Sequence, residues 1–204
     1  MPPLPRIGVL AVQGDVAEHL AALEESGARA RTIKTPADLR SVDGLIIPGG
    51  ESTTVMKLLD RAGLAGPLRR RALEGMPLWG TCMGMIVMAR DVVSLQQPTL
   101  DLIDISVRRN AFGRQIASAE VPLNIPALGE APFPAVFIRA PWIERAGMDV
   151  CVLASLDGHG VLVRQNQILA SAFHPELTPD RRLHEYFIAM VNAQISIGTE
   201  AARA

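Results

Sequence analysis

The feature of this sequence that most constrains its fold is a single cysteine between two glycines, where an apolar run gives way to a helical pattern. The run Met76–Trp79 has the apolar character of a buried strand, and Gly80, Cys82 and Gly84 follow it. Side chains at the two glycine positions would crowd a neighbouring strand or helix. The pattern predicts a strand, a sharp turn and a helix, with the thiol at the tip of the turn.

The predicted position of Cys82 suits nucleophilic chemistry. The free N–H groups and the dipole at a helix N-terminus favour a thiolate. The same N–H groups can stabilise the oxyanion that forms when a thiolate attacks a carbonyl. A buried structural cysteine in the same turn is equally consistent with this stretch alone, so the rest of the chain has to decide between the two interpretations.

Size and charge narrow the class of protein. The chain has 204 residues, 49% of them hydrophobic, and a formal net charge of -1. That length predicts one domain over residues 1–204, with residues 1–6 and 198–204 frayed. Near-zero charge gives no electrostatic basis for binding nucleic acid or an anionic membrane, and Arg69–Arg71 fits a solvated helix face. No apolar stretch is long enough to span a bilayer.

The two cysteines, Cys82 and Cys151, lie far apart in the sequence and do not form a disulfide framework. The proline-rich residues 1–6 are too short for a signal peptide. A reducing cytoplasm is the compartment consistent with both observations. Cys151 sits in a β-branched run without glycines, and we interpret it as part of the core.

The first third of the chain alternates between apolar runs and helical patterns. The predicted strands are 7–12, 29–33 and 44–47, and the predicted helices are 16–26 and one that starts at Thr35 and Pro36. Continuous apolar runs are typical of strands that are buried on both faces of a parallel sheet. This alternation predicts an α/β fold.

The third of these strands ends in the stretch Pro48–Thr54, which opens a helix. Gly49 and Gly50 allow the backbone to approach a ligand closely, and ligands of open α/β sheets bind at such carboxyl ends. An ordinary glycine turn in which Ser52 or Thr53 caps the helix is compatible with this interpretation. The stretch is not a phosphate loop, because no Lys-Ser/Thr pair follows the glycines.

The second half has a β pattern and ends in a helix. The predicted strands are 102–107, 115–121, 135–138, the hairpin 150–154 with 160–164, and 168–173, and the helix starts at 178–180. The loop Arg108–Arg114 carries three arginines, which suit a carboxylate ligand, although a solvated loop is the simpler interpretation. Arg139 follows a strand and belongs either to the surface or to a site. His159, in the hairpin turn, is expected to be solvated.

His174 and Glu176 follow the last strand. Residues two apart on a strand point the same way, and a histidine oriented by a carboxylate is the general base of a catalytic triad. His19 and His184 are alternative bases, but both fall within helical patterns and rank lower. No pair of cysteines or histidines has the spacing of a zinc site, so we predict no metal.

Five or more motifs occur together along the chain. They are Val12-Gln13-Gly14 with Glu18-His19, Pro48 to Thr54, Gly80-Thr81-Cys82-Met83-Gly84, Arg109 to Gln115, Phe137 to Pro141, and Phe173 to Thr178. In this order they resemble class I (triad) glutamine amidotransferases and, more narrowly, the family of glutaminase subunits of pyridoxal 5′-phosphate synthases. The resemblance extends from about residue 7 to the last helix.

The resemblance implies a three-layer, flavodoxin-like fold with a mixed, mostly parallel sheet and helices on both faces. It also implies hydrolysis of L-glutamine to L-glutamate and ammonia through a glutamyl thioester. Cys82 would be the nucleophile, His174 the base and Glu176 its orienting carboxylate. Backbone N–H groups of Gly50 and Met83 would form the oxyanion hole.

Further expectations follow from the same resemblance. The implied contacts to glutamine are Gly50, Glu51, Ser52, Arg109, Ile138 and Arg139. The ammonia would pass to a separate synthase subunit, a (β/α)8 barrel that makes pyridoxal 5′-phosphate, and this chain would need no cofactor. The chain departs from the family at Met83, where the family has a small residue. The larger side chain would alter packing near the site, or contact the ammonia exit and the partner.

Two other functions stay open at this point. One is a glutaminase that supplies ammonia to another acceptor, or a stand-alone thiol hydrolase. The Arg109 loop and the run Phe137–Pro141 argue against it. The other is a regulatory subunit without catalysis, against which the intact set of Cys82, His174 and Glu176 argues. We also expect weak activity from the isolated chain, because an oxyanion site of flexible glycine backbone needs a partner to set it.

Overall fold

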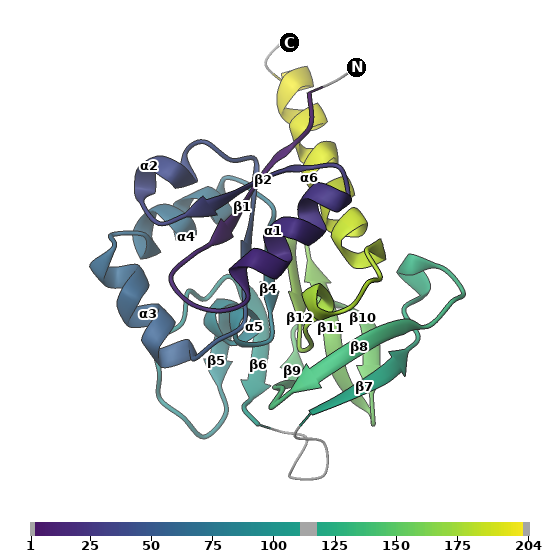
Figure 1. The fold of residues 1–204 in the computed structure, drawn as a ribbon. Helices are drawn as coiled ribbons and strands as arrows, with labels where there is room; N and C mark the ends of the chain where they lie inside the picture. Colours follow the sequence, from purple (N-terminus) through teal and green to yellow (C-terminus); the bar gives the residue numbers. More distant parts are fainter. Residues whose placement is uncertain (1–2, 111–117, 202–204) are drawn as a thin grey trace.

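The computed structural model describes residues 3–110 and 118–201, and these form a mixed β-sheet between two layers of helices (Figure 1). The strands are β1 (Arg6–Leu10), β2 (Arg29–Ile33), β3 (Gly44–Ile47), β4 (Leu78–Thr81), β5 (Ala89–Val92), β6 (Ile103–Arg108), β7 (Ser118–Leu123), β8 (Phe133–Ile138), β9 (Trp142–Ala146), β10 (Cys151–Leu156), β11 (His159–Gln165) and β12 (Ile168–Ser171). The helices are α1 (Val16–Glu25), α2 (Pro36–Leu39), α3 (Ser52–Arg61), α4 (Ala65–Leu73), α5 (Met83–Met88) and α6 (Arg182–Ala201), with 3-10 turns η2 (Pro126–Leu128) and η3 (Pro175–Leu177).

One half of the sheet is parallel, in the order β2-β1-β3-β4-β12. Strands β3, β4 and β12 are buried along their whole length, as continuous apolar runs predict for strands covered on both faces. Helix α1 contacts α6, and α3 contacts α4 and α5 (Figure 1). The predicted three-layer, mostly parallel α/β fold is confirmed, and β2 and β3 have the predicted bounds.

The other half of the sheet is largely antiparallel. Beyond β12 the order continues β11-β9-β6-β5, and β10 pairs with β11 as the predicted hairpin. The sequence did not predict β5 or β9, because both are short and carry exposed charged residues that hide the apolar pattern. Strands β7 and β8 form a separate antiparallel pair. The predicted strand 115–121 lies partly outside the described residues, which resume at Ser118.

Cys151 is exposed, so its assignment to the core was wrong. Among the described residues, strand β10 pairs with β11 and with no other strand, and its side chains are mostly exposed or half-buried. The β-branched pattern around Cys151 was therefore a property of a strand, but not of a buried one. His159 begins β11 and stacks on Trp142 with ring centroids 3.7 Å apart, so it is held by a ring contact rather than free in a turn.

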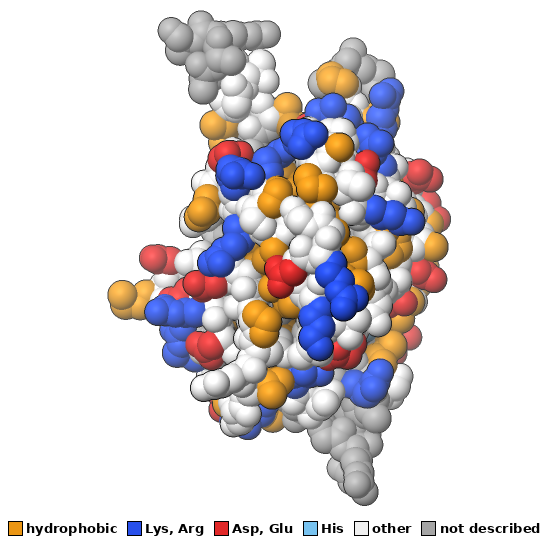
Figure 2. All heavy atoms as spheres, turned by 90° about the vertical axis from the view of Figure 1, so that its left-hand side faces the viewer, with side chains coloured by type: hydrophobic (Ala, Val, Ile, Leu, Met, Phe, Trp, Pro, Cys, Tyr) orange, Lys and Arg blue, Asp and Glu red, His pale blue; other side chains and the backbone are white. Residues whose placement is uncertain are grey.

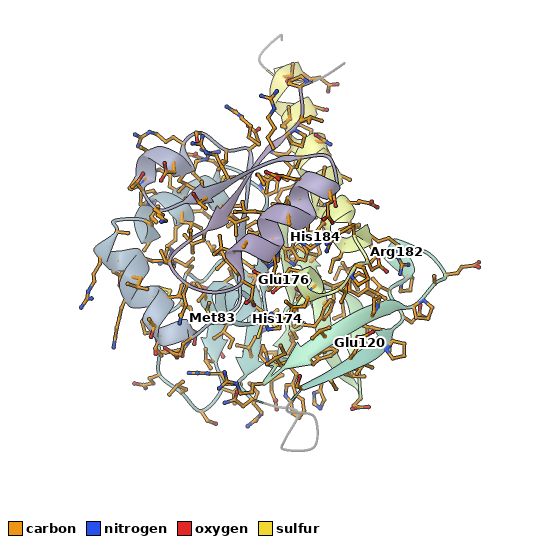
Figure 3. All side chains as sticks on the ribbon, viewed as in Figure 1. Met83, Glu120, His174, Glu176, Arg182 and His184 are labelled. Atoms are coloured by element: carbon orange, nitrogen blue, oxygen red, sulfur yellow. The ribbon has the colours of Figure 1, made fainter. Side chains whose placement is uncertain are left out.

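The sequence signals for helix starts predicted the start of α2 correctly and that of α6 a few residues too early. Thr35 caps α2 with a reciprocal capping box to Asp38, as predicted. Helix α6 begins at Arg182 rather than at 178–180, because η3 turns the chain first. The Arg182 guanidinium donates to Asp180 and to the Ala131 carbonyl oxygen, which ties the start of α6 to the loop before β8 (Figure 3).

The side of the molecule that carries α2, α3 and α4 shows basic and acidic side chains interspersed with apolar ones (Figure 2). Arg69 and Arg70 are exposed there, as expected of a solvated face, whereas the Arg71 guanidinium donates to the carbonyl oxygens of Leu39 and Val42. Within residues 3–110 and 118–201, no helix combines the length and the apolar character that crossing a membrane would require.

Candidate active site

Cys82 occupies a strained turn between β4 and α5. Its φ of 50° and ψ of -105° lie in a region that residues other than glycine rarely adopt, and it forms the N-cap of α5. A Cβ on Gly84 would lie 2.0 Å from the Ile47 carbonyl oxygen, and one on Gly80 would lie 2.5 Å from the Gly84 backbone. The two glycines are therefore required by close approach, and the predicted strand, turn and helix are confirmed.

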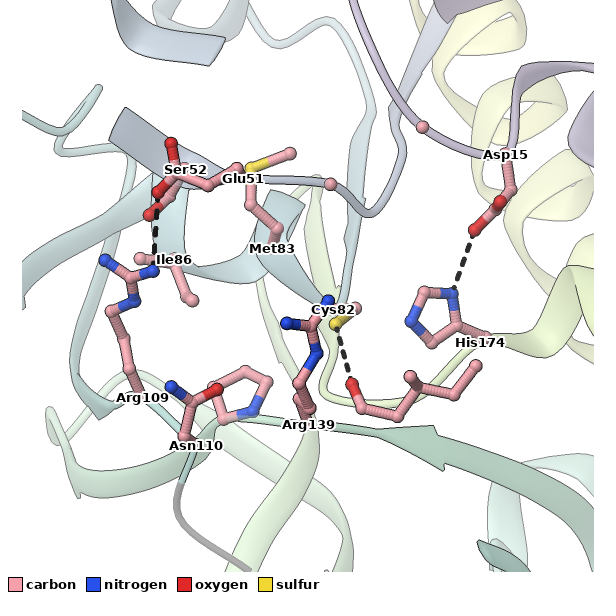
Figure 4. A pocket seen from close by; sticks show the side chains of 14 residues that line it. Asp15, Glu51, Ser52, Cys82, Met83, Ile86, Arg109, Asn110, Arg139 and His174 are labelled. Atoms are coloured by element: carbon pink, nitrogen blue, oxygen red, sulfur yellow. Dashed lines mark hydrogen bonds and ion pairs between the residues drawn. The ribbon is translucent and has the colours of Figure 1, made fainter. Parts of the chain in front are cut away.

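The Cys82 side chain is buried but opens on a cavity. Cys82 is 8% exposed, and its Sγ lies 3.8 Å from the Ile138 carbonyl oxygen at the end of β8 (Figure 4). Met83 is the first residue of α5, so its backbone N–H has no partner inside the helix. Free N–H donors and the positive end of the helix dipole next to a thiol favour attack on a polarised carbonyl.

His174 lies between Cys82 and two carboxylates. Its Nδ1 is 2.8 Å from Glu176 Oε1 and 3.3 Å from Asp15 Oδ2, and its other ring nitrogen turns toward Cys82 (Figure 4). The backbone N–H of His174 donates to the Val136 carbonyl oxygen at 2.8 Å, which anchors the histidine to β8. A thiol, an imidazole and a carboxylate in this order are the groups from which a catalytic triad can be built.

The predicted reason for the alignment of His174 and Glu176 was wrong. The two residues do not alternate along a strand, because Pro175 begins the 3-10 turn η3 and His174 is the residue before it. In this turn the Glu176 side chain folds back onto the imidazole. Gly49 supports the same packing, since a Cβ there would lie 2.6 Å from His174 Cε1.

The protonation of His174 follows from its neighbours. Burial lowers the pKa of His174, but the hydrogen bonds and charges of Cys82 and Glu176 outweigh burial and raise the pKa to about 10. Burial raises the pKa of Glu176, against the hydrogen bond and charge of His174. His174 therefore holds a proton at neutral pH and can donate it during a reaction.

A cavity of about 360 Å³ lies in front of Cys82, a size in the range of small-molecule sites. Its lining residues are Gly14, Asp15, Gly50, Glu51, Ser52, Cys82, Met83, Ile86, Arg109, Asn110, Ile138, Arg139, Pro141 and His174. The structure thus brings every residue that the sequence analysis named for glutamine contact and for the oxyanion hole to one cavity. Glu176 lies behind His174 and does not line it.

Two arginines, Arg109 and Arg139, and two carboxylates, Asp15 and Glu51, contribute charge to the cavity. Arg109 and Arg139 project into it, and an Arg109 nitrogen lies 3.4 Å from Glu51 Oε1 (Figure 4). Arg139 has a φ of 44°, an uncommon conformation at the end of β8 that turns the chain at the cavity wall. A guanidinium binds a carboxylate through a pair of parallel N–H donors, so arginines in a cavity suit a carboxylate ligand.

Glu51, and not Ser52 or Thr53, caps α3. Its carboxylate accepts hydrogen bonds from the backbone N–H groups of Thr53 and Thr54, at 3.2 and 2.8 Å, and from both of their hydroxyl groups. Hydrogen bonding to Thr53, supported by that to Thr54, outweighs burial and lowers the pKa of Glu51 to about 2. The carboxylate is therefore ionised at any pH at which the protein is expected to work.

Ser52 is a wall residue rather than a cap. Its hydroxyl donates to Gln97 Oε1 at 3.2 Å, and Arg109 donates to the same oxygen at 3.3 Å. Gln97 thereby connects α3 with the arginine. No sequence signal pointed to Gln97, because it lies in an irregular segment far from either partner along the chain.

Asp15 and Gln13 are further site residues to which the sequence analysis gave no role, although Gln13 lies in one of its motifs. Gln13 Oε1 accepts a hydrogen bond from the Glu51 backbone N–H at 3.1 Å, and Asp15 reaches His174. Both follow the carboxyl end of β1, and this position was an available signal. Asp15, His174 and Glu176 place ligand atoms within 4.8 Å of one another, but His174 Nδ1 is already engaged by both carboxylates, so we assign no metal to them.

The chain is similar to known proteins along most of its length. Residues 9–193 match the model of the SNO glutamine amidotransferase family. The chain is 54% identical over 200 residues to the pyridoxal 5′-phosphate synthase subunit PdxT of Acidothermus cellulolyticus, which covers 95% of this chain and 97% of the relative. It is 53% identical over 193 residues to the PdxT subunit of Mycolicibacterium vanbaalenii, and the alignment covers 92% of this chain and 98% of that relative.

A solved structure described as a glutamine amidotransferase superposes with a TM-score of 0.87 at 46% identity, covering 91% of this chain and 98% of that one. The fold and site define a glutamine amidotransferase, an enzyme that takes nitrogen from the side-chain amide of glutamine. The chain belongs to the SNO glutamine amidotransferase family. Its activity is that of a glutaminase.

Proposed function

We propose that this chain hydrolyses L-glutamine through the triad Cys82, His174 and Glu176 and passes the ammonia to a synthase subunit that makes pyridoxal 5′-phosphate. The observation that carries the triad is the position of His174, whose Nδ1 meets Glu176 Oε1 at 2.8 Å while its other face turns toward Cys82. The similarity to PdxT subunits supports the pathway. The (β/α)8 architecture of the partner is part of the proposal.

The first half of the reaction forms a thioester. The Cys82 thiolate attacks the side-chain amide carbon of glutamine, and the carbonyl oxygen takes up the electron pair as an oxyanion. The backbone N–H groups of Gly50 and Met83 stabilise this oxyanion. His174, already protonated, donates its proton to the amide nitrogen, the C–N bond breaks and ammonia leaves. Each oxyanion donor of this kind is typically worth about a hundredfold in rate.

The second half returns the enzyme to its starting state. Neutral His174 takes a proton from water, and the resulting hydroxide attacks the thioester carbon. The C–S bond breaks, and the thiolate and imidazolium are restored. The product carboxylic acid releases its proton to water and leaves as glutamate. Glu176 orients the imidazole and stabilises its positive charge in both halves. No step needs a cofactor.

The cavity suits the amino-acid end of glutamine. Arg109 and Arg139 supply cations for the α-carboxylate, and Glu51, held ionised by its cap contacts, suits the α-ammonium group. The Ile138 carbonyl at the end of β8 offers a main-chain acceptor near the reacting amide. Gly50 and Ser52 complete the wall on the α3 side. Two free cysteines fit a reducing compartment such as the cytoplasm.

Release of glutamate from L-glutamine tests this proposal, first with the chain alone and then with its cognate synthase subunit. We expect a low rate alone, a higher rate with the partner, and loss of both in Cys82→Ala. A rate that is high alone and indifferent to the partner would remove the pathway assignment while leaving the chemistry. If glutamine stays intact in both assays, the chain acts on another substrate or only binds a partner.

A further inference from the structure

Behind the proposed triad lies a set of buried polar groups that the reaction above does not use. His19 on α1 and His184 on α6 are both 0% exposed, and Glu176 lies between them and His174. In Figure 3 the labels of His184, Glu176 and His174 follow one another down the centre of the molecule. Two histidines that are fully buried next to a catalytic carboxylate call for a physical explanation.

The contacts connect the two histidines to one oxygen of Glu176. His19 Nε2 lies 3.3 Å from Glu176 Oε2 and 3.2 Å from Thr81 Oγ1, and His19 Nδ1 lies 3.2 Å from His184 Nε2. Glu176 Oε1 is taken by His174. Each carboxylate oxygen therefore faces a different histidine.

The oxygen Oε2 of Glu176 is poorly satisfied. Within the described part of the chain, it is inaccessible to solvent and has no hydrogen bond of good geometry. His19 Nε2 forms an ion-pair contact with it at 3.3 Å, and the backbone N–H of Glu176 itself also interacts with the carboxylate. A carboxylate oxygen without a donor in such a place is strongly destabilised. Contacts of this kind are often long in a resting enzyme and tighten as charge develops during the reaction.

The protonation states make His19 a donor toward Glu176. Burial, helped by the charges of His184 and His174, lowers the pKa of His19 well below its usual value. Burial and the charge of Arg181 lower the pKa of His184 to about 3. Both rings are therefore neutral at neutral pH, and each carries a single N–H.

One tautomer arrangement satisfies these contacts. Because Glu176 only accepts, His19 must hold its proton on Nε2, which leaves Nδ1 as an acceptor. His184 must then donate from Nε2, and its Nδ1 keeps a bare lone pair. That atom has no partner within the described residues, as this arrangement requires. The opposite arrangement would bury an N–H without an acceptor and would turn a lone pair of His19 toward the carboxylate.

Trp79 holds the two imidazoles in place. Its ring packs at a steep angle to His19 and His184, with centroid distances of 5.9 and 5.0 Å, and its own N–H donates to Ser171 Oγ at 3.1 Å. The rings thus have fixed orientations, and the donor on His19 stays directed at Thr81 and Glu176.

We propose that His19 is a positioning residue for Glu176, donating its Nε2–H to the second carboxylate oxygen in a tautomer that His184 fixes. The inference rests on the triad proposed above. Its consequence is that the Glu176 carboxylate keeps both its charge and its orientation toward His174. Neither His19 nor His184 lines the cavity, so this role is separate from glutamine binding.

Loss of His19 has a predictable effect on pH dependence. Glu176 is faced by His174 from its own turn and by His19 from α1, and burial, together with the charge of Asp15 in the loop before α1, raises the pKa of Glu176. Without the His19 donor, the pKa of Glu176 rises further, and below that pKa His174 loses its counter-charge. The Cys82 thiolate is then less stabilised, so its reactivity falls at a higher pH than in the wild type.

The experiment uses the full chain with its cognate synthase subunit, in a Cys151→Ser background so that Cys82 is the thiol that reacts. His19→Leu removes the donor, and His19→Gln keeps one. We expect His19→Leu to lower kcat about tenfold with little change in KM, as loss of a hydrogen bond to a charged group does. In His19→Leu we also expect the acid limb of the pH profile of Cys82 alkylation by iodoacetamide to move to higher pH. His19→Gln should restore most of the kcat and most of the position of the acid limb.

Three results would overturn the proposal or decide it by another route. A folded His19→Leu variant with the kcat and pH profile of the wild type contradicts the proposal. A fall in kcat that His19→Gln does not rescue, and that leaves the acid limb of Cys82 alkylation unmoved, also contradicts it, because such a fall indicates a packing defect. If His19→Leu does not fold, His184→Leu decides: a smaller fall in kcat with a shifted acid limb supports the proposal, and an unchanged profile contradicts it.

A parallel Glu176→Gln variant separates this inference from the proposed function. If Glu176→Gln retains the wild-type rate, the triad itself is wrong. If Glu176→Gln loses activity while folded His19→Leu keeps it, the triad stands and only the role of His19 falls.

Discussion

On one side of His174 lie groups that solvent does not reach, and on the other lie groups that it does. The side chains of Glu176 and His19 are 0% exposed, whereas those of Glu51 and Arg109 are 42% and 30% exposed. Charges that are cut off from water interact strongly, and charges at the surface are screened. If the proposed function holds, the comparison teaches that the buried side sets protonation, and hence rate, while the open side sets recognition of the substrate.

The largest effect on kcat is expected at Cys82, which lies between the buried side and the open side. Cys82→Ala removes the nucleophile but no packing contact of comparable size, so the protein should fold while kcat falls by at least about a thousandfold. Glutamate release in the presence of the synthase subunit measures this loss, with Cys151→Ser as the matched cysteine control at wild-type rate. An equal fall in kcat in Cys82→Ala and Cys151→Ser would contradict the assignment of Cys82 as the nucleophile.

The next effect belongs to the buried side. Glu176→Gln should lower kcat by about a hundredfold or more while KM changes little, because it acts on the charge of His174. Loss of the carboxylate removes a group that raises the pKa of His174, so the alkaline limb of the rate profile should move down from about pH 10. Rates measured across pH test both expectations, and an unmoved alkaline limb would contradict them.

Substitutions on the open side should change KM rather than kcat. Arg109→Ala should raise KM for glutamine by about tenfold or more and change kcat little, because it removes a cation for the substrate carboxylate. The neighbouring Arg108→Ala is the matched control, since Arg108 pairs with Glu144 and does not line the cavity. A fall in kcat at constant KM in Arg109→Ala would place this arginine on the catalytic side instead.

The smallest effect is expected at Met83. Its side chain is buried against the cavity, but its proposed oxyanion role uses only the backbone N–H. Met83→Ala should therefore leave kcat within about threefold of the wild type, while the larger cavity raises KM slightly. Steady-state kinetics in the complex measure this change. A clear increase in kcat would show that the methionine slows turnover.

Local patterns explain why much of the site could be predicted from the sequence. The strand–turn–helix at Cys82 depends on glycines whose requirement arises within a few residues and the strand beside them. The strand at residues 44–47 is a continuous apolar run, which has few alternatives in a buried parallel sheet. The late His174 and Glu176 could be recognised as a pair, although a 3-10 turn and not a strand aligns them.

Contacts between distant segments explain the rest. His19 and His184 are 165 positions apart, and helical spacing alone gave no sign that they meet. Gln97 reaches Ser52 and Arg109 from an irregular segment. The exposure of Cys151 depends on β10 pairing with one strand alone. Each of these facts is decided by which elements pack together, and a single sequence does not encode that information in any local pattern.

Trapping of the acyl-enzyme tests the central claim most directly. The complex is mixed with glutamine, quenched in acid within one turnover and digested, and the peptides are weighed. The account predicts a glutamyl adduct on the peptide that contains Cys82, none on the peptide that contains Cys151, and no adduct in Cys82→Ala. Glutamate release that proceeds without such an adduct, and that persists in Cys82→Ala, would contradict it.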